Sequence, residues 1–309
     1  MTGTPPRPPT GEQHEIRRGD QVAVVTEVGA TLRTYDVASR PVVAGFDASA
    51  KVEGGSGQIL APWPNRVRDG RYRFDGEDQQ LALSEAKAGN AIHGLVRWVG
   101  WGLAERGEDW VALTTTVWPQ PGYPFLLAVR ATYRLSDDGL AVTVEARNEG
   151  TRAAPYGVGQ HPYVTAGTER VDDAELVLPA RTRVVTDERG NPVSTEAVAG
   201  TSYDFVEARR IGDLRLDTAY GDLVRGSDGR TRVRLTDPAT DGGVEVWMGP
   251  TAENLQVFSG DTLKDPAQRR AALAVEPMSC PPGALASGAG LVVLAPGEEH
   301  TLDWGVHKF

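Results

Sequence analysis

Three residues of the chain have side chains suited to proton transfer: His93, His161 and Glu276. A histidine titrates near neutrality and can serve as a general acid. Because Pro162 favours an extended backbone at His161, we expect the imidazole to project from the end of a strand. Glu276 ends the apolar run 272–275, and partial burial raises the pKa of a carboxyl group towards that of a general base. Each residue alone is about as typical of a hydrogen-bonded structural side chain, so only together do they predict acid–base chemistry.

A second group of residues could hold hydroxyl groups. Asn65 and Arg66 precede a turn, and a planar guanidinium can donate paired hydrogen bonds to vicinal hydroxyls. Asp217 and Gln256 are polar residues among apolar ones. Two tryptophans follow His93 closely, and aromatic faces suit the C–H faces of a pyranose. These residues are compatible with a sugar site, although a solvated loop is the simpler explanation of Asn65 and Arg66.

Composition and missing motifs exclude several other functions. The 32 basic and 42 acidic residues give a net charge of −10, which disfavours nucleic acid or an anionic membrane as partner. We find no nucleophile elbow, no phosphate-binding glycine loop and no zinc-binding histidine pair. The lone Cys280 is more typical of a packed thiol than of a nucleophile. The proline-rich start lacks the apolar segment of a signal peptide, and with the single cysteine it predicts a cytoplasmic protein.

Period-two alternation of apolar and polar residues predicts an all-β fold. The runs 125–135 and 140–147 alternate on either side of an Asp-Gly turn, which indicates an antiparallel hairpin with one buried face. Shorter strands are expected at 71–74, 110–118, 231–236 and 244–248, and a short helix at 265–273. No composition break marks a linker. We therefore expect a disordered tail over residues 1–12 and a single large antiparallel β-sandwich domain over 13–309.

Taken in order, six segments of the chain resemble the aldose 1-epimerase (galactose mutarotase) family. These segments are Asn65-Arg66 with 70–74 (GRYRF), 90–94 (NAIHG), 160–163 (QHPY), 203–205 (YDF) with 216–217 (LD), 255–260 (LQVFSG) and Glu276-Pro277. The resemblance spans about residues 60 to 285. Each motif is weakly specific, but six in the family's order and spacing are fairly specific.

The resemblance implies a supersandwich, the large β-sandwich of galactose mutarotases, with a free hexose in an open cleft and no cofactor or metal. It implies that Glu276 is the general base for the C1 hydroxyl, that His161 is the general acid for the ring oxygen, and that His93 assists near the reacting oxygens. The sugar-binding residues that it implies are Asn65, Arg66, Tyr163, Asp217 and Gln256. The expected partner is a small-molecule sugar, and the expected assembly is a monomer or homodimer.

Three alternatives stay open. A phosphorylated or sulfonated hexose would need additional cations, and four arginines lie near the candidate residues in sequence: Arg68, Arg71, Arg73 and Arg97. Glu276 and Asp217 could instead be the paired carboxylates of a glycosidase, which would release a phenol from aryl glycosides. A non-catalytic sugar-binding protein of the same fold would bind sugars without changing the rate of anomer exchange.

Overall fold

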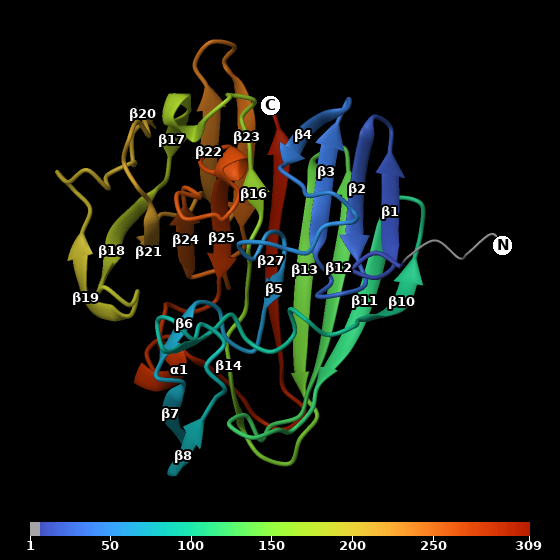
Figure 1. Cartoon of the computed structure of the whole chain (residues 1–309), viewed down its shortest axis with the longest axis vertical. Helices are drawn as coiled ribbons and strands as arrows, with labels where there is room; N and C mark the ends of the chain where they lie inside the picture. The colour runs from blue at the N-terminus through green and yellow to red at the C-terminus, as the bar shows by residue number, and fades with distance from the viewer. Residues whose placement is uncertain (1–6) are drawn as a thin grey trace.

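The computed structural model describes residues 7–309, and within them two large antiparallel sheets form the molecule. Figure 1 shows them as two layers, with the blue strands of residues 13–43 in front of the green strands of residues 102–148. Three two-stranded ladders and one short helix lie beyond one end of the layers. The all-β sandwich expected from the alternating sequence is confirmed.

The first sheet has twelve strands among the described residues, ten of which form one continuous ladder. The order of this ladder is β1 (Gln13–Arg18), β2 (Gln21–Thr26), β3 (Leu32–Val37), β4 (Arg40–Val43), β16 (Tyr163–Val164), β25 (Leu273–Met278), β24 (Asn254–Phe258), β21 (Asp217–Leu223), β18 (Ala180–Thr186) and β19 (Pro192–Ala197). The remaining two strands are β5 (Ile59–Leu60) and β15 (Gly159–Gln160), and β15 pairs with both β5 and β25.

The second sheet has nine strands among the described residues. Their order is β10 (Gly102–Arg106), β11 (Trp110–Val117), β12 (Leu127–Ser136), β13 (Gly139–Asn148), β27 (Glu299–Lys308), β23 (Gly242–Met248), β22 (Thr231–Asp237), β17 (Glu175–Val177) and β20 (Arg209–Arg210). The predicted hairpin is β12–β13, in which Ser136 pairs with Gly139 across a two-residue turn. The four shorter predicted strands are confirmed as β7 (Arg71–Phe74), β11, β22 and β23.

The small ladders pair β6 (Arg66–Arg68) with β9 (Asn90–Ile92), β7 (Arg71–Phe74) with β8 (Glu77–Gln80), and β14 (Ala154–Tyr156) with β26 (Val292–Leu294). The helix is α1 (Ala284–Ser287), and 3₁₀ turns occur at Val171–Asp173 and Pro266–Gln268. None of the helices in residues 7–309 has the length and apolar character needed to cross a membrane.

The core lies between the two sheets. Alternate residues of neighbouring strands, such as Leu255 and Val257 of β24 and Val275 of β25, are fully buried in one cluster with Tyr133 and Trp304 of the second sheet. Successive side chains of a strand point to opposite faces. Polar residues between these apolar ones therefore point to the outer face of the first sheet, where short loops cover them.

Two predictions from the sequence differ from the structure. The helix expected at 265–273 is reduced to the 3₁₀ turn, capped by Asp265, because Arg270 takes a positive φ and Leu273 already begins β25. The predicted disordered tail is too long. Residues 1–6 lie outside the described residues, but Thr10 is buried and its carbonyl accepts a hydrogen bond from the Val28 amide.

Candidate active site

Glu276 and Gln256 are placed side by side by the register of β24 and β25. The two residues are direct partners across the ladder, and both alternate with core residues, so both point to the outer face of the first sheet. Glu276 is nevertheless only 1% exposed, and the His161 imidazole lies against its carboxyl group. A carboxyl group in such a position is costly unless it is paired or used.

His161 is fixed by the strand that precedes it. The fully buried Gln160 donates hydrogen bonds to the Tyr133 hydroxyl (2.8 Å) and the Gly57 carbonyl (3.1 Å), and it accepts one from the Trp304 indole (2.9 Å). These bonds tie β15 to the second sheet. The backbone that carries the His161 imidazole is therefore held rigidly, as a catalytic group requires.

Two further neighbours hold the ring of His161. Tyr163 stacks on it with 5.1 Å between ring centroids, and the tyrosine hydroxyl donates a hydrogen bond to the Gly54 carbonyl. A Cβ at Gly55 would lie 2.9 Å from the imidazole, so glycine is required for this close approach. Tyr163, expected to bind sugar, is 5% exposed and has its hydroxyl occupied. In this structure its ring supports His161, and sugar binding by Tyr163 stays a prediction.

The imidazole and the carboxyl group meet directly. His161 Nε2 lies 3.2 Å from Glu276 Oε1. Burial, and then the charge of Asp217, raises the pKa of Glu276 well above its usual value. Burial also lowers the pKa of His161 to about 3. Burial therefore favours the neutral form of both groups.

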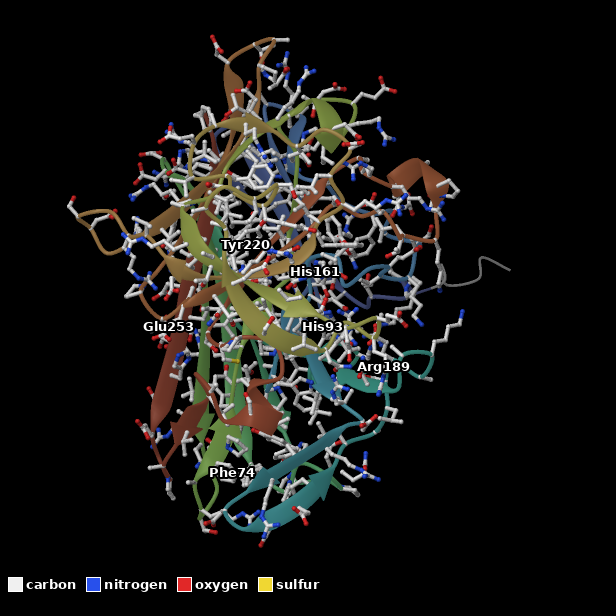
Figure 2. The ribbon with its side chains drawn as sticks, turned by 90° about the vertical axis from the view of Figure 1, so that its left-hand side faces the viewer. Phe74, His93, His161, Arg189, Tyr220 and Glu253 are labelled. Carbon is white, nitrogen blue, oxygen red and sulfur yellow. The ribbon has the colours of Figure 1, made fainter. Side chains whose placement is uncertain are left out.

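His93 provides a second imidazole with a different role. It follows β9 at a φ of 62°, and its Nδ1 accepts a hydrogen bond from the Asn65 amide at 3.2 Å. Burial, followed by the charge of Arg97, lowers the pKa of His93 well below its usual value, so the ring is neutral. A neutral imidazole whose Nδ1 accepts must carry its proton on Nε2. His93 is thus a fixed hydrogen-bond donor, and its ring lies edge-on to His161 with centroids 5.7 Å apart; Figure 2 shows the two together in the middle of the molecule.

The predicted hydroxyl-binding residues form one hydrogen-bonded row. Asn65 Nδ2 donates to Gln256 Oε1 (3.2 Å), and Gln256 Nε2 donates to Asp217 Oδ1 (2.6 Å). Arg66 Nη1 lies 3.9 Å from the other oxygen of Asp217. The structure therefore brings together all the predicted site residues. Their row leads away from the His161–Glu276 pair across β24 to β21.

Glu85 holds Arg66 in place and was not predicted from the sequence. It accepts two hydrogen bonds from the guanidinium of Arg66, from Nε at 2.9 Å and from Nη2 at 3.0 Å, and a third from Asn90 Nδ2 at 3.0 Å. Gly190 packs closely against the guanidinium of Arg66, because a Cβ at this position would lie 2.6 Å from Arg66 Nη1. The only signal in the sequence is Asn90 itself, four residues before Gly94 in the segment that contains His93.

We expect the substitution Glu85→Gln to raise KM about tenfold and to change kcat much less. Glutamine cannot accept both guanidinium hydrogen bonds, and a bond to a charged group contributes roughly 1.5–3 kcal/mol. Steady-state anomer exchange measured over a range of sugar concentrations checks this. Glu77→Gln is the matched control, because Glu77 forms a comparable pair with Arg152 far from the site. An equal loss in both variants would contradict the assignment.

We also expect Glu276→Gln to raise the melting temperature, and to do so more at pH 8 than at pH 5. The folded pKa of Glu276 lies above the unfolded value of 4.5, so the folded state holds more protons than the unfolded one. The stability that the carboxyl group of Glu276 contributes is fully present below the unfolded pKa of 4.5 and is lost as the pH rises through the folded pKa. Glutamine does not ionise, so the variant does not lose this stability. Calorimetry at both pH values tests it, with the exposed Glu253→Gln as control; a gain independent of pH would contradict it.

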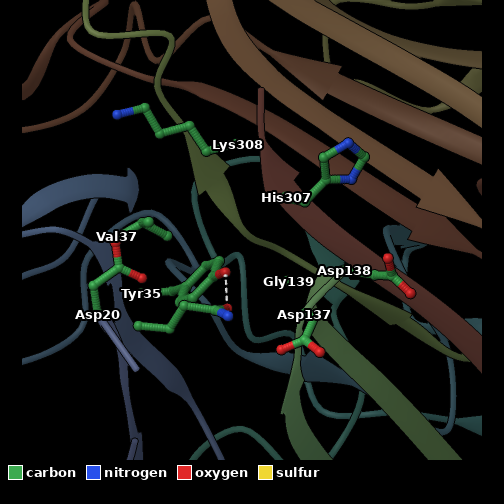
Figure 3. Close-up of a pocket in the computed structure, with 9 residues that line it drawn as sticks. Asp20, Tyr35, Val37, Asp137, Asp138, Gly139, His307 and Lys308 are labelled. Carbon is green, nitrogen blue, oxygen red and sulfur yellow. Dashed lines mark hydrogen bonds between the residues drawn. The ribbon is translucent and has the colours of Figure 1, made fainter. Parts of the chain in front are cut away.

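The cavity in Figure 3 lies elsewhere and holds none of the predicted site residues. It is lined by Asp20, Tyr35, Asp137 and His307 among others, between the β2 and β12–β13 ends, and it measures about 290 Å³. Within residues 7–309, no three His, Cys, Asp or Glu side chains are grouped as metal ligands would be. The buried pair His161–Glu276 is a better candidate than this cavity, because strongly perturbed pKa values mark functional sites.

Comparison with known proteins agrees with the resemblance found in the sequence. The family model for aldose 1-epimerase matches residues 12–306. The chain is 34% identical to the uncharacterised protein YihR of Escherichia coli (strain K12) over 96% of this chain and 94% of that protein. It is 27% identical to the aldose 1-epimerase of the same organism, over 67% of this chain and 64% of that enzyme.

Solved structures show the same fold. An aldose epimerase homologue from C. elegans superposes with a TM-score of 0.85 at 18% identity, covering 96% of this chain and 98% of the other. The galactose 1-epimerase of Lactobacillus acidophilus NCFM superposes with a TM-score of 0.78 at 21% identity, with the same coverage. The fold is that of the galactose mutarotases. The chain belongs to the aldose 1-epimerase family.

Proposed function

We propose that the protein is an aldose 1-epimerase that interconverts the α and β anomers of a free hexose such as galactose or glucose. The observation that carries this proposal is the buried His161–Glu276 contact of 3.2 Å, beside the fixed donor His93. Mutarotation needs one acid and one base at the C1–O5 unit. In this proposal His161, directly after β15, supplies the acid, and Glu276 on β25 supplies the base.

The proton balance of the pair fits ring opening. A carboxylate with an imidazolium holds the same number of protons as a carboxyl group with a neutral imidazole. In the first state, Glu276 accepts the proton of the C1 hydroxyl, His161 donates one to the ring oxygen, and the C1–O5 bond breaks to leave an aldehyde. The pair is then neutral, which is the state that burial favours here. Rotation about C1–C2 followed by the reverse transfers closes the ring as the other anomer.

The remaining residues position the sugar. His93 Nε2–H can donate to an oxygen on which negative charge develops, without releasing its proton. Glu276 Oε2 and His161 Nδ1 are buried and have no hydrogen-bond partner among the described residues, so both have unused hydrogen-bonding capacity. Asn65, Arg66, Asp217 and Gln256 hold the hydroxyls along the row. The test is polarimetry or NMR of freshly dissolved α-glucose and α-galactose. Unchanged equilibration rates for both sugars would reject the proposal.

A second candidate substrate is a hexose with an anionic group at C6, such as a phosphate or a sulfonate. Arg68 and Arg73 pair with Asp187 and Asp78, and Arg71 bonds Gln80, so these three arginines are occupied. Arg97 differs. It donates to the Gln58 side chain (3.5 Å) and the Ile92 carbonyl (3.2 Å) but has no carboxylate partner among residues 7–309. Its Nε is buried without a hydrogen bond, and burial lowers its pKa to about 10.

The place of Arg97 suits such a group. Its charge lowers the pKa of both His93 and His161, so the guanidinium lies near both imidazoles, and His161 is the proposed acid for the ring oxygen. C6 is attached to C5, next to that oxygen. If the anionic sugar is the substrate, kcat/KM for glucose 6-phosphate exceeds that for glucose, and Arg97→Met removes the excess. Equal values for the two sugars in the unaltered protein would exclude this candidate.

A further inference from the structure

The turn between β18 and β19 contacts the small ladder of β6 and β9. Within the turn, Asp187 Oδ1 accepts hydrogen bonds from the amides of Arg189 and Asn191, both at 2.9 Å. The Gly190 amide bonds the Asp187 carbonyl, and Gly190 has a φ of 75°, a conformation that favours glycine. The turn, residues 187–191, is therefore shaped by its own hydrogen bonds, and the Arg189 side chain extends from it to the ladder.

Arg189 holds the end of the β6–β9 ladder that lies opposite His93. Its Nε donates a hydrogen bond to the Ala88 carbonyl at 2.6 Å. Its Nη2 donates to the Gly89 carbonyl at 2.8 Å and to Asp69 Oδ1 at 2.7 Å. These acceptors lie directly before β9 and directly after β6, so one guanidinium binds both strands of the ladder. Figure 2 shows Arg189 and His93 in one view.

The bonds to the two carbonyls matter more than the ion pair. The side chains of Arg189 and Asp69 are 38% and 52% exposed, and so exposed an ion pair contributes little. The bonds to Ala88 and Gly89 are partly buried, and their donor is charged. The main effect of Arg189 is therefore on the loop that contains these carbonyls, residues 85–90.

This loop carries Glu85, the partner of Arg66. The backbones of Glu85 and Asn90 exchange two hydrogen bonds, at 2.9 and 3.3 Å, which close the loop. The fully buried Asn90 donates from Nδ2 to Glu85 Oε2 at 3.0 Å and to the Arg189 carbonyl at 2.9 Å. Glu85 in turn accepts the two guanidinium bonds of Arg66. A chain of hydrogen bonds thus runs from Arg189 through Asn90 and Glu85 to Arg66.

The turn also contacts Arg66 directly. A Cβ at Gly190 would lie 2.6 Å from Arg66 Nη1, so the backbone next to Arg189 lies against the guanidinium. Arg66 is therefore held by two segments, the 85–90 loop and the 187–191 turn. Arg189 joins these two segments, which are about 100 residues apart in the chain.

We infer that Arg189 is a positioning residue for the proposed reaction: it joins the 187–191 turn to the 85–90 loop and so fixes the Arg66 guanidinium for the sugar hydroxyls. The inference rests on the proposed function, in which Arg66 binds the substrate. Among residues 7–309, the hydrogen-bond and ion-pair partners of Arg189 include neither His161 nor Glu276. Arg189 therefore affects how well the sugar is held, and proton transfer itself does not depend on it.

The experiment measures steady-state anomer exchange of glucose and galactose by Arg189→Met and Arg189→Gln. We expect each variant to raise KM about fivefold and to change kcat less than about twofold, because binding is weakened while the acid and the base stay in place. An unchanged KM in either variant, shown to be folded by circular dichroism, would overturn the inference. Arg189→Gln keeps the test valid if Arg189→Met does not fold.

Arg225→Met is the matched control. Arg225 follows the end of β21 remote from Asp217, and it also donates to several carbonyls, those of Gly229, Gly249, Pro250 and Ala252. We expect its KM to equal that of the unaltered protein. An increase as large as that of the Arg189 variants would show a general effect of lost carbonyl bonds and would overturn the positioning role.

A double variant separates positioning from a general loss of stability. Arg189→Met combined with Glu85→Gln should raise KM little beyond Glu85→Gln alone, because both changes act on the same guanidinium. If the two increases multiply, Arg189 acts independently of Arg66 and the inference is wrong.

Hydrogen–deuterium exchange gives a readout that does not depend on activity. If the unaltered protein turns over no sugar, the proposed function fails, and the exchange of residues 85–93 then decides the role of Arg189. Faster exchange of this segment in Arg189→Met but not in Arg225→Met would support the link from Arg189 to the loop of Glu85. Equal exchange in the two variants would overturn it.

Discussion

Replacing Glu276 with glutamine is expected to lower kcat for anomer exchange by about 10²–10⁴-fold, the usual contribution of a general acid–base group. Glutamine has nearly the same shape as a neutral carboxyl group, so packing on β25 is preserved. What disappears is the ability to accept and return the C1 hydroxyl proton. KM should change little, because Asn65, Arg66 and Gln256 still hold the sugar.

Equilibration of α-glucose followed by polarimetry measures this loss. Glu253→Gln is the control for a carboxyl-to-amide change on a neighbouring segment, since Glu253 is exposed just before β24. Full activity of Glu276→Gln would remove Glu276 from the mechanism. If neither the unaltered protein nor the variant accelerates exchange, a sugar-binding protein is favoured over an enzyme.

The substitution His161→Asn is expected to lower kcat by a similar factor, about 10²–10⁴-fold. Asparagine can occupy the position beside Tyr163 and donate a hydrogen bond, but it cannot release a proton to the ring oxygen. The loss of the stacked ring also costs some stability, so the folded fraction of the variant has to be verified by circular dichroism. His307→Asn is the matched control, because His307 lies on β27 beside the remote cavity of Figure 3.

The kinetics of the two variants together separate the roles. If His161 is the acid and Glu276 the base, the double variant should lose little more than either single one, because the two groups act as a unit. Activity of His161→Asn equal to that of the unaltered protein would transfer the acid role to another donor. The nearest such candidate is His93.

Strand periodicity carried most of the fold prediction. The alternation in 125–147 gave the β12–β13 hairpin and its turn, and the same alternation explains why Gln256 and Glu276 leave the core and share the outer face. The prediction of a short helix at 265–273 was wrong, because the capping signal at Asp265 concerns only the first turn. Arg270 is bound by Asp172 and Asp261, and these partners were not visible in the helix pattern.

The site was predicted as a set of residues but not as an arrangement. The order of motifs led to His93, His161 and Glu276, and the structure places them together. Their protonation could not be predicted, because it depends on burial and on charges such as those of Asp217 and Arg97 from other segments. For the same reason Glu85 was missed: its carboxylate meets Arg66 only after β6 and β9 have paired.

The row of polar residues across the first sheet also bears on how the chain acquires activity. The hydrogen bond between Asn65 and Gln256 joins residues 191 positions apart, and His161 and Glu276 come from two further segments. Contacts between residues so far apart in sequence form slowly, because the chain loses entropy on closing a long loop before the favourable contacts form. During refolding from denaturant, the circular dichroism signal should therefore recover before the rate of anomer exchange does. The recovery of activity would then report on the last step of folding.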